Sequence, residues 1–210
     1  MALTGIQKTV IVMVAAVAVV IGLTVNKVTR PVPLDRDQLS RAGIFLFEQP
    51  RSIPEVSLRS AAATAWGRDD LVGQWDLLFF GYTFCPDICP TTMAELRQLV
   101  SALPEERREQ LQVTMVSVDP NRDTPEQMSS YLSFFDAGFK GATGDPEELA
   151  RLAQALSVAY IEPDTSEENY LVDHSGQVIL VDPQGQYAGF IRPPLKPQEL
   201  AHWLPRVMQE

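Results

Sequence analysis

The chain opens with a long apolar run. Residues 9–25 carry no charge and are almost wholly apolar, which is close to the length that crosses a bilayer as one helix. The run is longer than the apolar core of a cleaved signal peptide, and its small-residue pattern at Ala16 to Ala18 lies inside the run rather than after it. We therefore predict an uncleaved membrane anchor over residues 1–25.

The pattern then becomes polar. Residues 26–43 include Pro31 and Pro33, and this composition is typical of a linker rather than of part of a core. We predict a tether over residues 26–43 and one folded domain over residues 44–210.

Within the domain, strand-like and helix-like patterns alternate. A continuous apolar run at residues 77–82 predicts a central strand covered on both faces, and a second β-rich run follows at residues 113–118. Apolar residues between these runs recur at helical spacing, so we expect a helix directly after the first strand. Those residues are Met93, Leu96, Leu99, Val100 and Leu103.

Two later helices have clear start signals. Thr124 is followed by Pro125 and, three positions on, by Gln127, which is typical of a capped helix N-terminus. The segment that begins at Asp145 and Pro146 follows the same rule. The apolar residues that these two helices should bury are Met128, Tyr131, Leu132, Phe135, Leu149, Leu152, Ala153 and Leu156.

The end of the domain changes to strands. Strand-like segments at residues 178–182 and 187–191 flank a Pro-Gln-Gly-Gln turn, which predicts a β-hairpin. A last helix is predicted by Leu200, Trp203, Leu204 and Val207. Alternating β and α units followed by a hairpin and a closing helix predict an α/β sandwich with a mixed central sheet. This order is that of a thioredoxin-like fold, here preceded by an N-terminal transmembrane helix.

Composition and charge exclude some classes of function. Hydrophobic residues make up 45% of the chain and charged residues 21%, as in an ordinary folded domain. The formal net charge is −10 and no long run of Lys or Arg occurs, which argues against a nucleic acid as partner.

The candidate chemistry begins with two cysteines. Cys85 and Cys89 are the only cysteines and lie at the predicted strand-to-helix junction, where one helical turn would place both on one face. A helix N-terminus favours the thiolate, which is the form that binds metals or attacks disulfides. A metal site, a redox pair and two buried apolar side chains all remain open from this spacing alone.

A third ligand has to come from elsewhere in the chain. His174 lies where an apolar run ends in a turn just before the predicted hairpin, whereas His202 lies beside Trp203 in the last helix and should pack or face solvent. Two thiolates and one imidazole suit Cu(I), which accepts low coordination, better than zinc, which prefers four ligands. We predict one copper ion per chain at Cys85, Cys89 and His174, with Cu(I) favoured and Cu(II) allowed.

Asp119 follows the second strand run and is expected at the same edge of the sheet as the cysteines. It could lie near the cysteine rim and help a partner to dock. Equally, Asp119 and Asp123 could do no more than cap turns before Pro120 and Pro125.

Four stretches carry a resemblance to a known family: residues 71–90, 116–128, 143–149 and 170–176. Over them the sequence resembles the Sco/SenC family of copper proteins for cytochrome c oxidase assembly. The family's C-P-x-x-C-P motif falls on Cys85, Pro86, Cys89 and Pro90, and its metal-binding histidine falls on His174. Residues 51–65 depart from the pattern, because relatives usually have a clearer glycine-containing hairpin there.

The resemblance implies a single copper site and delivery of copper or electrons to the dinuclear copper centre of the oxidase. Its implied partners are the copper-bearing oxidase subunit, other copper chaperones and thiol-disulfide reductases. It also implies an oxidising compartment, so we expect a single-pass protein of a bacterial inner membrane with its soluble domain in the periplasm.

Two other functions compete with this metallochaperone hypothesis. A general thiol-disulfide oxidoreductase of the thioredoxin superfamily would use Cys85 to attack and Cys89 to resolve, although thioredoxins have two rather than three residues between their cysteines. A peroxidase of peroxiredoxin type would need Thr and Pro before its cysteine, and only Thr83 is in a loosely similar position.

Overall fold

The computed structural model describes residues 4–29, 34–161 and 170–209. The chain divides into two units, one over Met1–Leu34 and one over Asp35–Glu210. The first unit contains helix α1 (Gly5–Thr29). Its segment Gly5–Thr24 has a mean hydropathy of 2.3 and is long and apolar enough to cross a membrane, which agrees with the predicted transmembrane helix. The helix itself continues past the predicted end of the anchor at residue 25.

The second unit begins earlier than the sequence analysis predicted. Helix α2 (Arg36–Arg41) starts at Asp35, whose carboxylate accepts a hydrogen bond from the backbone N–H of Asp37 at 2.9 Å. Leu39 is only 1% exposed. Residues 35–43, which we had placed in the tether, are therefore part of the compact unit, because one buried leucine ties the short helix to it.

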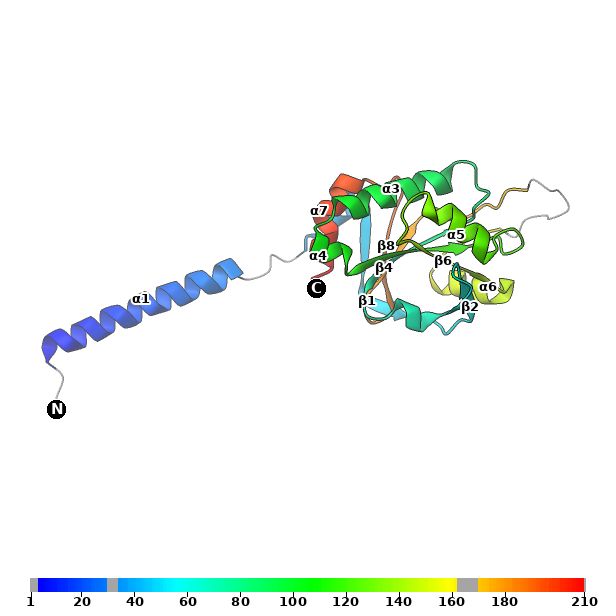
Figure 1. The fold of residues 1–210 in the computed structure, drawn as a ribbon. Coiled ribbons are helices and arrows are strands. Elements are labelled where there is room, and N and C mark those ends of the chain that lie inside the picture. The colour runs from blue at the N-terminus through cyan, green and yellow to red at the C-terminus, as the bar shows by residue number, and fades with distance from the viewer. Residues whose placement is uncertain (1–3, 30–33, 162–169, 210) are drawn as a thin grey trace. The chain divides into compact units, whose positions relative to one another are not determined.

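The core of this unit is an eight-stranded sheet with the order β1-β8-β7-β4-β5-β6-β2-β3. The pairs β4–β5 and β5–β6 are parallel and the other pairs are antiparallel. The sheet is therefore mixed, as predicted, and Figure 1 shows it as the centre of the fold. Its strands are β1 (Ile44–Ser52), β2 (Leu58–Ser60), β3 (Ala65–Trp66), β4 (Trp75–Gly81), β5 (Leu111–Ser117), β6 (Lys140–Gly144), β7 (Val178–Val181) and β8 (Gln186–Ile191).

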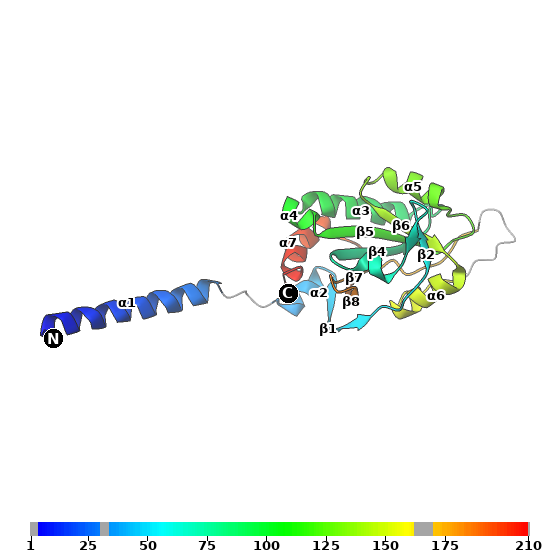
Figure 2. The same ribbon diagram turned by 60° about the horizontal axis from the view of Figure 1, so that its bottom comes forward.

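Helices cover both faces of the sheet. The remaining elements are η1 (Arg68–Leu71), α3 (Ile88–Ala102), α4 (Glu105–Arg108), α5 (Pro125–Ser133), α6 (Pro146–Ala155) and α7 (Pro197–Val207). Helices α3, α5 and α7 lie on one face and α6 lies on the other, as the two views in Figures 1 and 2 show. This is the predicted thioredoxin-like arrangement.

The predicted starts of α5 and α6 are confirmed. The Thr124 hydroxyl accepts a hydrogen bond from the backbone N–H of Gln127 at 3.2 Å. The Asp145 carboxylate accepts one from Glu147 N–H at 2.8 Å. Each bond satisfies a backbone donor that a helix N-terminus would otherwise leave unpaired.

The central strand β4 lies in the interior of the sheet. All seven residues of β4 are buried, and it lies between β5 and β7. The predicted β7–β8 hairpin is also present, and its turn contains Gly185 at φ +70°. The carboxyl end of β4 therefore gives a rigid starting point for the cysteine loop.

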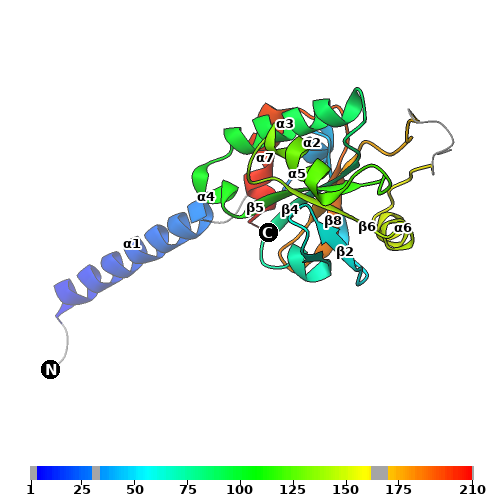
Figure 3. The same ribbon diagram turned by 45° about the vertical axis from the view of Figure 1, so that its right-hand side comes forward.

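The segment that departs from the family pattern still forms a hairpin. Strands β2 and β3 pair antiparallel at the edge of the sheet, where β2 lies beside β6 (Figure 3). Their turn has no glycine, and Ala63 takes the left-handed conformation at φ 60° instead. The Ser60 and Thr64 hydroxyls lie 2.8 Å apart across the turn.

Candidate metal centre

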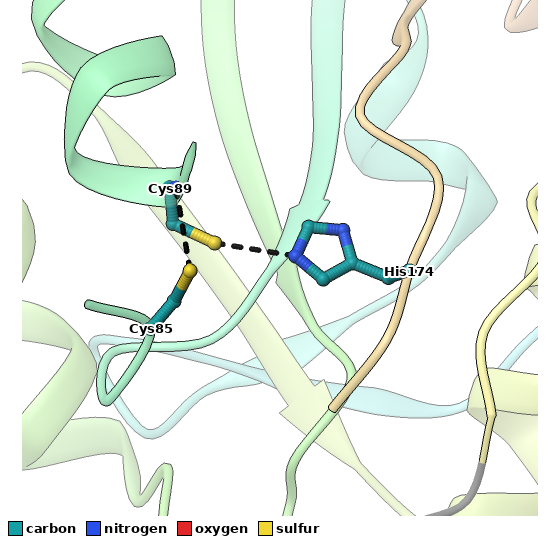
Figure 4. Close-up of side chains that lie close together, drawn as sticks. All are labelled: Cys85, Cys89 and His174. Carbon is teal, nitrogen blue, oxygen red and sulfur yellow. Dashed lines mark hydrogen bonds between the residues drawn. The ribbon is translucent and has the colours of Figure 1, made fainter. Parts of the chain in front are cut away.

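Three segments bring the predicted ligands together. Cys85 lies in the loop after β4, Cys89 lies in the first turn of α3, and His174 lies in the segment before β7. Their ligand atoms, two Sγ and one imidazole nitrogen, lie within 4.8 Å of one another. Figure 4 shows the imidazole pointing at the two sulfurs. No other cluster of three such side chains occurs in the part of the chain that the structure describes.

Backbone bonds fix the cysteine loop. The Cys85 N–H donates to Tyr82 O at 3.3 Å and closes the turn after β4. The Cys89 N–H points at Cys85 Sγ at 3.4 Å, so the helix N-terminus supplies a hydrogen-bond donor to that sulfur. Cys85 is 8% exposed and Cys89 is fully buried, which makes Cys85 the sulfur that a partner can reach.

Gly81 makes room for the inner thiol. A Cβ atom at this position would lie 2.9 Å from Cys89 Sγ and 2.7 Å from the Phe79 ring. Real Cβ atoms do not approach neighbours this closely. The last residue of β4 therefore has to lack a side chain if Cys89 is to keep its place.

The histidine is held in one tautomer. His174 Nδ1 lies 3.1 Å from Ser175 O, and a carbonyl oxygen only accepts, so Nδ1 carries the proton. The unprotonated Nε2 then faces Cys89 Sγ at 3.3 Å. The rings of Phe79 and Tyr82 meet the imidazole edge-on at 5.9 and 6.0 Å. A histidine arranged in this way presents its lone pair to a metal.

Burial sets the charge of the site. It raises the pKa of the Cys89 thiol well above its ordinary value and lowers the pKa of His174, because both charged forms lose solvation. The helix N-terminus was expected to lower the thiol pKa, but for Cys89 desolvation is the larger effect. The site without metal therefore holds a neutral imidazole and a protonated inner thiol at neutral pH.

The rim of the site is open and carries both apolar and acidic side chains. A pocket of about 310 Å³ is lined by Cys85, Ile88, Leu171 and His174 and also by Asp87 and Asp173. The side chains of Ile88 and Leu171 are 41% and 65% exposed. A partner protein can therefore approach the outer cysteine across exposed apolar side chains that lie beside two carboxylates.

Asp119 lies at the same edge of the sheet but does not reach the ligands. It is 1% exposed, and its carboxylate accepts hydrogen bonds from Arg122 Nε and from Tyr170 Oη. Its backbone carbonyl also accepts from the N–H groups of Arg122 and Asp123, as in a turn. Because its carboxylate is enclosed in this way, it cannot contact a partner directly.

Neighbouring polar residues form a second buried group that the sequence analysis did not identify as such. Asp123 accepts hydrogen bonds from the Thr83 backbone N–H, from Thr83 Oγ1 at 2.6 Å and from Ser117 Oγ at 2.7 Å. Burial raises the pKa of Asp123 despite these bonds. Through its hydrogen bonds with Thr83, the Asp123 carboxylate thus links the cysteine loop to the β5–α5 loop.

The other histidine lies away from this site. His202 is exposed and packs edge-on against Trp203, as expected.

The donor set fits a soft metal. Two sulfurs and one imidazole are the ligands that Cu(I) accepts at low coordination number, whereas structural zinc sites use four protein ligands. The fold and the site together define a thioredoxin-like protein with a candidate metal centre of two cysteines and one histidine.

Comparison with known proteins gives the family. The SCO1/SenC family model matches residues 48–209, and the chain belongs to this family. A protein of Stutzerimonas stutzeri, named as a candidate copper-binding protein, is 44% identical over 176 residues, which cover 83% of this chain and 86% of that protein.

Solved structures agree with this assignment. ScoI of Bradyrhizobium japonicum with copper bound is 33% identical, with a TM-score of 0.67 over 74% of this chain and 98% of that chain. ScoI of Arabidopsis thaliana with copper bound is 30% identical, with a TM-score of 0.69 over 75% of this chain and 99% of that chain.

Proposed function

We propose that this protein is a copper metallochaperone that assists assembly of the dinuclear copper site of cytochrome c oxidase. Its cargo is one copper ion, held by Cys85 Sγ, Cys89 Sγ and His174 Nε2. The observation that carries the proposal is the convergence of these three atoms within 4.8 Å, in a family whose solved members include copper-bound proteins.

The two cysteines have different tasks in this proposal. Cys89 is buried and its pKa is raised, so its proton leaves as the metal binds. Cys85 lies at the opening of the pocket, so a partner's thiolate replaces it first. Transfer then proceeds by exchange of ligands across this rim.

The same asymmetry supports the alternative function. In a thiol-disulfide oxidoreductase the accessible Cys85 would attack a disulfide and the buried Cys89 would resolve the mixed disulfide. His174 Nε2, at 3.3 Å from Cys89 Sγ, would accept the proton of the resolving thiol. Metal binding explains the convergence of all three ligands better, because disulfide formation needs no imidazole.

For the cellular setting we propose a single-pass protein of a bacterial inner membrane. Helix α1 is the anchor and the second unit lies in the periplasm. The apolar segment Gly5–Thr24 supports the anchor, and the family supports the oxidising compartment. The copper-bearing oxidase subunit is the proposed recipient, with other copper chaperones or thiol-disulfide reductases as further partners. Alkaline phosphatase fused after Glu210 should be active in intact cells, and an inactive fusion would reverse the topology.

Metal analysis of the full chain in detergent tests the copper site. After reduction and loading with copper, one ion per chain should remain bound, and Cys85→Ser/Cys89→Ser should lose it. Retention of high-affinity binding by that double variant would place the site elsewhere. Insulin reduction by the same samples measures the alternative, because strong reductase activity without copper retention would favour the oxidoreductase.

A further inference from the structure

Arg122 lies between the two halves of the candidate metal centre. Its guanidinium carbon lies 3.6 Å from the centre of the Tyr170 ring, and its Nη2 donates to Tyr170 O at 3.0 Å. Tyr170 is in the segment that leads to His174. Arg122 thus contacts this segment through both the ring and the backbone carbonyl of Tyr170.

Asp119 anchors the other side of Arg122. Its carboxylate accepts from Arg122 Nε and, at 2.7 Å, from Tyr170 Oη. Asp119 itself is fixed, because its N–H donates to Ser117 Oγ at 3.0 Å and its side chain is fully buried. We call Asp119, Arg122 and Tyr170 the arginine clamp. In a buried ion pair each partner depends on the other for compensation of its charge.

The clamp also reaches the cysteine loop. The Arg122 guanidinium lies 4.9 Å from the centre of the Phe84 ring, next to Cys85, and 5.7 Å from that of Tyr82. Tyr82 in turn accepts a hydrogen bond on its hydroxyl from the Val172 N–H at 3.2 Å. Aromatic side chains of the cysteine loop and the backbone of the histidine segment therefore meet around one guanidinium.

The histidine segment needs such support. His174 pairs with Tyr160 in an isolated bridge and is not part of a named strand. By contrast, Cys89 is in a helix and Cys85 directly follows the central strand. Two backbone hydrogen bonds hold this bridge, from Ser175 N–H to Ala159 O at 2.8 Å and from Ile161 N–H to Asp173 O at 2.9 Å. The position of Nε2 relative to the sulfurs thus depends on one short bridge and on side-chain contacts.

We propose that Arg122, held by Asp119, is a positioning residue that keeps His174 Nε2 against the two cysteine sulfurs. The inference rests on the proposed copper function and adds to it a residue that touches neither the metal nor its ligands. An arginine suits this task because its rigid planar fork donates in two fixed directions while its face stacks on a ring, and lysine has neither the fork nor the flat face.

A double-mutant cycle of copper affinities tests the proposal on the full chain in detergent. Arg122→Ala should weaken copper binding about 10- to 100-fold, the usual loss when a group that orients a metal ligand is removed. In a His174→Ala background the same substitution should cause no further loss, because a residue that acts only through the imidazole has nothing left to position. An equal loss in both backgrounds would overturn the proposal.

Two further variants separate positioning from charge and from general destabilisation. Arg122→Lys keeps the charge but loses the fork and the stacking, so it should weaken copper binding nearly as much as alanine. Full affinity in that variant would mean that only the positive charge matters, and the positioning role would be wrong.

Arg151 is a matched control, because it also pairs with an acid three positions away and donates to a distant carbonyl, that of Glu55. Arg151→Ala should leave copper affinity unchanged.

A metal-free measurement completes the test. In the reduced apo protein, amide hydrogen exchange at Val172 and Ser175 should accelerate in Arg122→Ala, while exchange in β4 and β5 should stay as in the wild type. Unchanged exchange at those two amides would overturn the clamp.

The design separates failure of the clamp from failure of the function. If His174→Ala binds copper as tightly as the wild type, the proposed copper site itself is wrong. If His174→Ala weakens binding but Arg122→Ala does not, only the clamp is wrong.

Discussion

The two halves of the metal centre are built in different ways. The cysteine half rests on regular structure, since Cys85 follows a strand with all seven residues buried and Cys89 begins the helix that comes next. The histidine half rests on an isolated bridge and on side-chain contacts. The first half is fixed by the core of the domain, whereas the second can be displaced without unfolding it. The position of the imidazole therefore depends on the arginine clamp, whereas the positions of the two sulfurs do not.

Of the substitutions that test this difference, replacing the histidine should have the largest effect on copper affinity. We expect His174→Ala to weaken copper binding about a hundredfold, or about 3 kcal/mol, because a site of three ligands loses one. Oxidation of Cys85 and Cys89 to a disulfide should change little, since the thiols can react without imidazole. Copper competition titrations and the thiol-disulfide redox potential measure the two effects. His202→Ala is the control, because His202 is exposed on α7.

The opposite result would change the function. If His174→Ala keeps wild-type copper affinity while its redox potential shifts strongly, the imidazole acts on the thiols and the oxidoreductase becomes the better proposal.

The same contrast explains what the sequence could predict. The cysteine half could be predicted from local sequence patterns. A wholly apolar strand and a helical spacing of apolar residues can be recognised without knowing any tertiary contact. His174 followed from ligand chemistry and from the family resemblance. Arg122 did not, because its role depends on Tyr170, 48 positions away, and no local pattern records such a contact.

Other elements were missed for related reasons. Strand β6 contains two glycines and no large apolar side chain, so it shows no alternation; its pairing with β5 and β2 defines it. Helix α2 has one buried leucine among polar residues, which resembles a linker until its tertiary contacts are known. The Ala63 turn lacks the glycine that would mark it.

A second substitution tests the cysteine half. In Gly81→Ala the new Cβ would meet Phe79 and Cys89 Sγ at 2.7 and 2.9 Å, so one of them must move. Overpacking of this kind costs about 1–3 kcal/mol of stability. We expect a lower free energy of unfolding together with weaker copper binding, measured by denaturant unfolding and copper titration. A variant with normal affinity would show that the inner sulfur is less fixed than the fold implies.

A third substitution probes the strand beneath the cysteines. Asp76 in β4 is 1% exposed and has an unpartnered Oδ1. Burial raises its pKa well above the ordinary value, and the Thr114 hydroxyl and the Lys140 charge oppose this only in part. A raised folded-state pKa means that the stabilising contribution of the protonated acid is complete below about pH 4, the unfolded value, and is lost as pH rises through the folded value.

Asp76→Asn should therefore raise the free energy of unfolding at neutral pH, by about 1 kcal/mol, and remove the decline of stability above about pH 4 that this group causes. Denaturant unfolding at several pH values measures it. Copper affinity should not change, because a more stable β4 leaves the cysteine loop as it was. A variant that is less stable than the wild type at neutral pH would contradict the raised pKa.

The smallest expected effect concerns a turn in neither half of the centre. Ala63 holds φ at 60°, which costs an L-residue about 1–2 kcal/mol, while glycine takes this conformation freely but loses more entropy on folding. The strain at Ala63 is larger than this entropic cost, so Ala63→Gly should raise the free energy of unfolding by about 0.5–1 kcal/mol. Ala62, exposed in the same turn without a positive φ, is the matched control, and Ala62→Gly should destabilise. Thermal unfolding compares the two, and copper affinity should be unchanged in both. If Ala63→Gly instead lowers stability, the bonds between Ser60 and Thr64 hold the turn without strain, and the absence of glycine from this hairpin carries no penalty.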